Sequence, residues 1–235
     1  LVVLVAWWGW GHILFRIVHQ KNAPWAVAAP AGVALLLVVG GWLNLFSLAD
    51  KNGILILCAI GWIAAILAII VQPRPSSTAS RPRWSWPLAA AIAIVILRYA
   101  ASVVTPLSAY SVHDDLQAYA VFPVRMVQTG AIGNDPFNER RLFTYGGVAF
   151  TEAFTLAEPR IENLNLADLG LGNILLFLAA VAVLGEWGIR GRTRDWLLLA
   201  LALFPVTQVD ANLSGCLIPA ALILVLVALL SQSFR

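Results

Sequence analysis

Apolar residues fill most of this chain in runs long enough to cross a membrane, and polar residues gather in one long interval between those runs. A helix needs roughly 20 apolar residues to cross the hydrocarbon of a bilayer. The pattern predicts an all-α, polytopic transmembrane helix bundle of about seven spans, with short extracytoplasmic surface helices in the polar interval. The seven segments are 1–18, 25–47, 53–72, 87–107, 169–188, 196–211 and 214–231.

The sixth segment is short and ends in the polar sequence Val209–Asn212. It is expected to be a broken helix or to form a tight hairpin with the seventh. Pro30 lies inside an apolar segment and is expected to kink its helix. Tryptophans near the ends of the predicted spans fit an interfacial aromatic belt, whereas those at positions 7, 8 and 10 indicate a packing face.

The polar interval divides the chain into three parts. Residues 1–101 form the N-terminal transmembrane part, whose fourth span runs to about residue 107; residues 102–168 form an extracytoplasmic loop, and residues 169–235 form the C-terminal transmembrane part. The loop holds eight of the twelve acidic residues: Asp114, Asp115, Asp135, Glu139, Glu152, Glu158, Glu162 and Asp168.

Inside this loop, short helices are expected to lie on the membrane surface. The segment Asp114–Gln128 places apolar residues on one helical face, and Gly130 is a natural helix end. A second apolar-periodic run extends from Gly147 to Ala157. These helices would cap the bundle.

Basic residues orient the bundle by the positive-inside rule. They fill three loops and the chain end, all of which fall on one side when the spans are counted: His19 and Lys21; Arg74, Arg81 and Arg83; Arg190, Arg192 and Arg194; and Arg235. The loop 102–168 falls on the opposite side, so it is predicted to be extracytoplasmic.

Composition supports a membrane protein and excludes several other classes. The chain is 60% hydrophobic and 11% charged, against roughly 25% charged residues in a soluble domain. The net charge is only +3, and the basic residues lie in short loops. This distribution indicates how the chain is oriented in the membrane, and it predicts no nucleic-acid partner. Cys58 and Cys216 match no metal or disulfide pattern and are expected to be buried thiols. Since the chain begins at Leu1 and its single methionine is Met126, a fragment of a longer protein is expected.

The sequence His113-Asp114-Asp115 opens the loop and is the best candidate for an active-site edge. Paired carboxylates beside a histidine can supply a general base or metal ligands. The alternative is an N-cap, in which one aspartate accepts the free amide hydrogens of the following helix. For His113 taken alone, a solvated loop histidine is the default interpretation.

Arginines in the same loop need a separate explanation, because basic residues are disfavoured on that side. Their planar fork of donors matches phosphate oxygens, which suggests an anionic lipid-phosphate substrate. The alternative is local ion pairing with neighbouring carboxylates, which contributes little energy. The residues are Arg125, Arg140, Arg141 and Arg160.

Three ionisable residues lie within predicted spans. His12, Arg16 and Arg98 should face the bundle interior, a partner or a wet cavity. Arg16 is near the inner interface and is expected to act as an anchor. Arg98 lies about 16 Å into its span at 1.5 Å per residue, and Asp210 is its expected partner.

The motif Asp-Asp-x-x-Ala-Tyr-x-x-Phe-Pro from Asp114, followed by Asp-Pro-Phe-Asn-Glu-Arg-Arg ending at Arg141, resembles uncharacterised bacterial relatives of the GT-C superfamily of polytopic membrane glycosyltransferases. The layout of a basic loop, a span, an external acidic motif, surface helices and a return span is similar as well. The resemblance implies a bacterial cytoplasmic-membrane enzyme that transfers a sugar from a lipid-phosphate-linked donor on the extracytoplasmic face.

By that resemblance, Asp114 or Asp115 activates the acceptor hydroxyl, and Arg140 or Arg141 holds the departing lipid phosphate. Substrate binding is assigned to His113, Tyr119, Arg125, Arg140 and Arg141. No cofactor is implied, and a divalent metal at the carboxylates is left open. Expected partners are the lipid-linked sugar donor, membrane lipids and other membrane subunits.

The alternative function is a non-catalytic structural subunit of a membrane assembly or a transporter fragment. Intramembrane Arg98 and His12, with prolines inside spans, suit a transport path. The polar residues are nevertheless concentrated outside the membrane, and the sequence contains no internal repeat.

Overall fold

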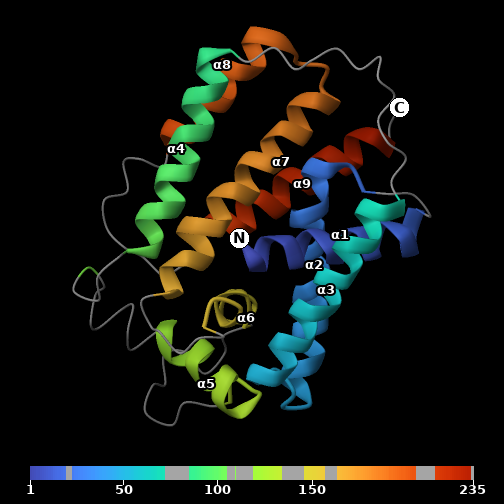
Figure 1. The fold of residues 1–235 in the computed structure, drawn as a ribbon, viewed down its shortest axis with the longest axis vertical. Coiled ribbons are helices and arrows are strands. Elements are labelled where there is room, and N and C mark those ends of the chain that lie inside the picture. The colour runs from blue at the N-terminus through green and yellow to red at the C-terminus, as the bar shows by residue number, and fades with distance from the viewer. Residues whose placement is uncertain are drawn as a thin grey trace.

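A computed structural model describes the chain as a helical bundle over residues 1–19, 23–71, 85–104, 109, 119–133, 146–156, 163–204 and 215–233, and no strand occurs within these ranges. Each of the seven predicted apolar segments contains a helix (Figure 1). The elements are α1 (Val2–His19), α2 (Trp25–Leu45), α3 (Lys51–Val71), α4 (Trp86–Val103), α5 (Val121–Thr129), α6 (Gly147–Ala153), the π-helical η5 (Leu166–Gly172), α7 (Asn173–Glu186), α8 (Gly191–Leu203) and α9 (Leu217–Ser233).

Four helices in the described part of the chain are long and apolar enough to cross a membrane. They are α2, α3, α4 and the continuous helix of η5 and α7, Leu166–Glu186. The molecule is therefore an all-helical membrane protein with four candidate spanning helices. The other apolar helices are shorter: α8 has 13 residues and covers about 20 Å at 1.5 Å per residue, less than the roughly 30 Å of hydrocarbon. Four of the seven expected spans are thus supported in the described ranges, and the other three stay a prediction.

Helix α1 lies against α2 and α3 with almost no side chain between the backbones. A Cβ atom at Gly9 would lie 1.8 Å from the Gly61 carbonyl oxygen of α3, and one at Gly11 would lie 1.8 Å from the Ala28 carbonyl oxygen of α2. Small residues permit this approach, which is typical of helix pairs in membranes. The tryptophans of α1 form the expected packing face, since Trp7 is buried and the Trp10 indole donates to the Leu57 carbonyl oxygen at 2.8 Å.

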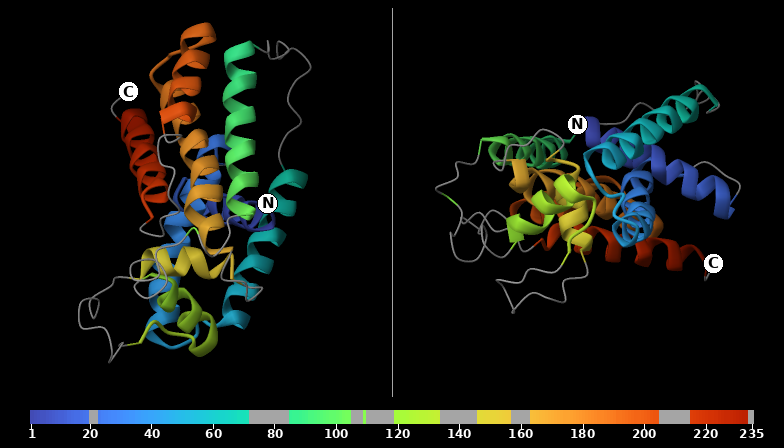
Figure 2. Two further views of the ribbon diagram at one scale, coloured as in Figure 1. Left: turned by 90° about the vertical axis from the view of Figure 1, so that its left-hand side faces the viewer. Right: turned by 90° about the horizontal axis from the view of Figure 1, so that it is seen from below.

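Two short helices, α5 and α6, lie across one end of the bundle (Figure 2). The turn after α5 is fixed to the α2–α3 connection, because Ala49 donates to the Gly130 carbonyl oxygen at 2.9 Å and the Ile132 amide donates to Asn44 Oδ1 at 2.8 Å. Gly130 ends α5 in the left-handed conformation, with φ of 82°. This helix end agrees with the sequence prediction.

Helix α6 is not a surface helix, which corrects the sequence prediction for this segment. All residues from Ala149 to Leu156 are buried. Phe154 packs edge-on against Trp7 of α1 and against Phe150, with ring centroids 6.0 Å and 5.3 Å apart, and the Phe150 ring covers Gly40 of α2. The two phenylalanines lie four positions apart, so they share one helical face and draw α6 into the bundle.

The opposite end of the bundle joins α4 to α8. Ser85 caps the N-terminus of α4, and its hydroxyl also donates to Asp195 of α8, which is held by Arg194 at 2.9 Å. Trp86 and Trp196 meet edge-to-face above this contact. Both indoles are exposed, Trp86 at the start of α4 and Trp196 in the second turn of α8, as an interfacial aromatic belt requires.

Candidate functional site

The sequence-predicted site lies largely outside the described residues. His113, Asp114, Asp115, Arg140 and Arg141 fall in the ranges 110–118 and 134–145, and the expected Arg98 partner, Asp210, falls in 205–214. Tyr119 and Arg125 are described. Both belong to the end of the bundle that α5 and α6 cover.

Arg125 and Tyr119 take part in local packing at that end. The Arg125 guanidinium donates to the Ile132 carbonyl oxygen at 3.4 Å, so its side chain folds back over the turn that ends α5. Tyr119 is half-buried and packs against a small apolar cluster that includes Leu156 and Leu164. The Tyr119 cluster joins the start of α5 to the segment leading into η5, and the Arg125 bond stabilises the turn after α5. Both residues thus have a structural role beside the predicted substrate contacts.

A buried carboxylate, Asp168, joins the start of the return helix to the start of α9. Asp168 is 5% exposed. One of its oxygens accepts from the Cys216 amide at 3.0 Å, and the other accepts from the Leu217 and Ile218 amides, each at 3.0 Å. The first amides of a helix have no partner within it, and a negative charge there complements the helix dipole. Asp168 therefore caps α9 from 48 residues away.

A cavity of about 150 Å³ lies beside this cap, between α2, α6, η5 and α9. Asp168 and Thr151 are the polar residues on its wall. Ligand pockets usually measure about 300–1,000 Å³, so this cavity is too small for a lipid-linked sugar. Asp168 is engaged by three amides, which assigns the carboxylate to helix capping.

Arg98 has a partner within the bundle, as predicted, whereas the expected pairing with Asp210 lies outside the described residues. Its guanidinium donates to Asn173 Oδ1 at 2.9 Å, and the Asn173 amide nitrogen donates in turn to the Leu169 carbonyl oxygen. That carbonyl belongs to η5, where the π-helical turn alters the hydrogen-bond ladder. The Ser102 hydroxyl, which donates to the Tyr99 carbonyl oxygen, lies against Gly170 of the same turn. A chain of polar contacts thus joins α4 to η5 and α7.

Sequence reasoning assigned no role to two buried carboxylates at this end, Glu152 and Asp168. They are 2% and 5% exposed. A signal is visible in the sequence: Glu152 stands between apolar neighbours in Ala-Phe-Thr-Glu-Ala-Phe, and Asp168 directly precedes a spanning run. Among the described residues, no group of three or more His, Cys, Asp or Glu side chains could hold a metal ion.

Comparison of the chain with protein-family models, with curated proteins and with solved structures gave no match.

Proposed function

We propose that this chain belongs to a membrane glycosyltransferase that takes a sugar from a lipid-phosphate-linked donor on the extracytoplasmic face. The observation that carries the proposal is the position of the acid-rich interval. Seven of the twelve acidic residues fall between α4 and η5, and an eighth, Asp168, lies in η5 itself. The described parts of this interval, α5 and α6, close one end of a membrane bundle (Figure 1). An enzyme acting on a lipid-linked substrate needs its polar groups at such a boundary.

The proposed reaction assigns a role to each predicted residue. Asp114 or Asp115 takes the proton of the acceptor hydroxyl, whose oxygen forms a bond to the anomeric carbon of the sugar. The bond between that carbon and the phosphate oxygen breaks, and the lipid phosphate leaves with the electron pair. Arg140 or Arg141 stabilises its developing charge, while His113, Tyr119 and Arg125 orient the donor.

The test uses the purified full chain in lipid nanodiscs with a polyprenyl-phosphate-linked radiolabelled hexose. General-base catalysis contributes about 10²–10⁴-fold, so either Asp114→Asn or Asp115→Asn should slow sugar transfer by that factor at unchanged melting temperature. Asp50→Asn is the control, because Asp50 caps α3. Full transfer by both loop variants would favour the N-cap interpretation and contradict the proposal.

A second candidate is a non-catalytic subunit of a membrane assembly. It is favoured by the use of polar groups for packing in the described bundle: Arg98 with Asn173, and Asp168 with α9. A subunit of this kind would co-purify with the other proteins of its assembly at fixed stoichiometry and would show no sugar transfer. The Asp114→Asn and Asp115→Asn variants would assemble with those proteins as the wild type does.

A further inference from the structure

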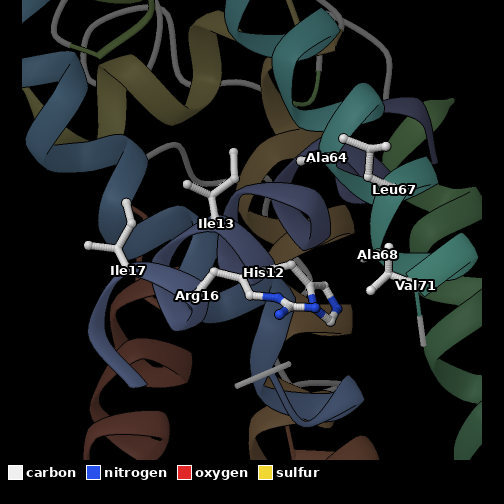
Figure 3. Close-up of a pocket in the computed structure, with 8 residues that line it drawn as sticks. All are labelled: His12, Ile13, Arg16, Ile17, Ala64, Leu67, Ala68 and Val71. Atoms are coloured by element: carbon white, nitrogen blue, oxygen red, sulfur yellow. The ribbon is translucent and has the colours of Figure 1, made fainter. Parts of the chain in front are cut away.

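A cavity of about 490 Å³ opens between the C-terminal halves of α1 and α3 (Figure 3). The two helices touch at Gly9 and Gly61, and the cavity begins one turn beyond this contact. Its volume falls within the usual range of ligand pockets. Most of its wall is apolar, with Ile13 and Ile17 from α1 facing Leu67 and Val71 from α3.

His12 is a buried polar group on this wall. The side chain is 3% exposed, and neither ring nitrogen forms a hydrogen bond with the described residues. The ring packs edge-on against Trp8, with centroids 4.1 Å apart. A buried polar group without a partner costs about 1–3 kcal/mol. In any protonation state the imidazole carries at least one N–H donor, so His12 is suited to an acceptor group inside the cavity.

Arg16 adds a permanent positive charge to the same wall. It lies four residues after His12 and therefore on the same helical face, and Figure 3 shows both side chains at the cavity. None of the described residues that line the cavity is acidic. Among the first 113 residues of the sequence the sole acidic one is Asp50, which caps the other end of α3, about 30 Å away at 1.5 Å per residue.

From this arrangement, we propose that the cavity binds the phosphate headgroup of an anionic membrane phospholipid. Arg16 and the His12 N–H donate to the phosphate oxygens, since charge-assisted bonds to guanidinium are the strong ones. The first acyl-chain carbons lie along the apolar wall, which continues into exposed side chains such as Ile17 and Val71. A small soluble anion would leave that wall uncovered.

This site is separate from the proposed transfer chemistry. The connection that precedes α3 adjoins the end of α5 through the Ala49–Gly130 hydrogen bond, whereas the cavity is lined by the last two turns of α3. The lipid site therefore lies at the opposite end of α3 from α5. Binding there follows from His12 and Arg16 and is independent of any transferase activity.

The experiment measures phosphatidylglycerol bound to the detergent-solubilised full chain by native mass spectrometry. Arg16→Gln removes a charge-assisted hydrogen bond and should weaken binding of the tightest lipid about tenfold. His12→Leu should weaken it as well. Arg192→Gln is the matched control, because it removes one exposed positive charge from the start of α8 and should leave the affinity unchanged. Since Arg16 is exposed, its replacement tests the site even where loss of buried His12 impairs folding.

Three results would overturn the proposal. The first is equal lipid affinity in the Arg16→Gln and Arg192→Gln variants, which would make the attraction nonspecific. The second is equal binding of zwitterionic phosphatidylcholine to the wild-type site, which would leave only an apolar groove. The third is displacement of phosphatidylglycerol by an equal concentration of inorganic phosphate, which would identify a site for a free anion.

Discussion

Asp168 shows how a single side chain can fix the position of a distant helix. Its carboxylate provides acceptors for three consecutive amides at the start of α9. A solvated loop carboxylate gains little from such contacts, whereas this one is buried, so its loss would leave several donors without partners.

Replacing Asp168 with alanine should therefore lower the free energy of unfolding by about 2 kcal/mol. The measurement is the melting temperature of the purified chain in detergent micelles. Asp50→Ala serves as a comparison, since the half-buried Asp50 accepts from a single amide, that of Gly53 at 2.8 Å, and its loss should cost only about 0.5–1 kcal/mol. Equal losses of unfolding free energy in the two variants would contradict the capping of α9 by three amide bonds to Asp168.

Arg98 and Asn173 form a pair whose energy can be isolated. Arg98→Met removes the donor to Asn173 Oδ1, and Asn173→Leu removes the acceptor of the Arg98 guanidinium, so each single change should destabilise the protein. The double variant should be more stable than the sum of the two losses predicts, by about 0.5–3 kcal/mol. Chemical unfolding of all four proteins completes the cycle. If the two losses of unfolding free energy simply add in the double variant, the contact between the Arg98 guanidinium and Asn173 contributes no stability.

The sequence predicted that Arg98 needs a polar partner, but it did not indicate Asn173 as one. Arg98 was expected to be paired because a charge within a span is expensive. The choice of Asn173, 75 residues away, depends on the packing of η5 against α4, which no local pattern encodes. The placement of Asp168 has the same cause, because its partners are backbone amides that carry no sequence signal.

At the scale of elements, run length was the decisive signal. Each predicted apolar segment contains a helix, since a membrane helix satisfies its backbone internally and its side chains need only be apolar. The position of α6 was not predicted correctly by the length of its apolar run. Its length and its polar residues Thr151 and Glu152 are typical of a surface helix, whereas its burial depends on Phe150 meeting Gly40 and Phe154 meeting Trp7.

The contact between α1 and α2 should be highly sensitive to one added methyl group. In the variant Gly11→Ala the new Cβ would stand 1.8 Å from the Ala28 carbonyl oxygen, so α1 must move, and overpacking costs about 1–3 kcal/mol. Gly41→Ala on α2 is the control, because a Cβ there meets nothing within 4 Å and alanine favours the helix by about 0.5–1 kcal/mol.

The two variants should therefore shift the melting temperature in opposite directions. If the Gly11→Ala variant melts at or above the wild-type temperature, α1 and α2 do not form this close backbone contact.

At the scale of the whole molecule, the bundle has two chemically different ends. The α2–α3 connection, α5 and α6 gather at one end, and the tryptophans Trp86 and Trp196 mark the other. The basic loops of the sequence predict that the first end faces outward.

A cysteine placed at exposed Gln128 on α5 should react with a membrane-impermeant maleimide in intact cells, in a background lacking Cys58 and Cys216. A cysteine at exposed Arg192, at the start of α8, should react only after lysis. Gel-shift labelling distinguishes the two. The reverse pattern would invert the orientation and move the proposed transfer site to the cytoplasm.

The Asp168 cap should hold α9 in the bundle even when the chain is cut before this helix. Asp168 holds the start of this helix, and buried Leu217, Ala221 and Val225 pack it into the main core beside α7. Hydrogen bonds and side-chain packing therefore hold α9 in the bundle along most of its length. A protease cut engineered between Phe204 and Gly215 should leave the last helix in place, so that two separately synthesised pieces reassemble into the intact bundle.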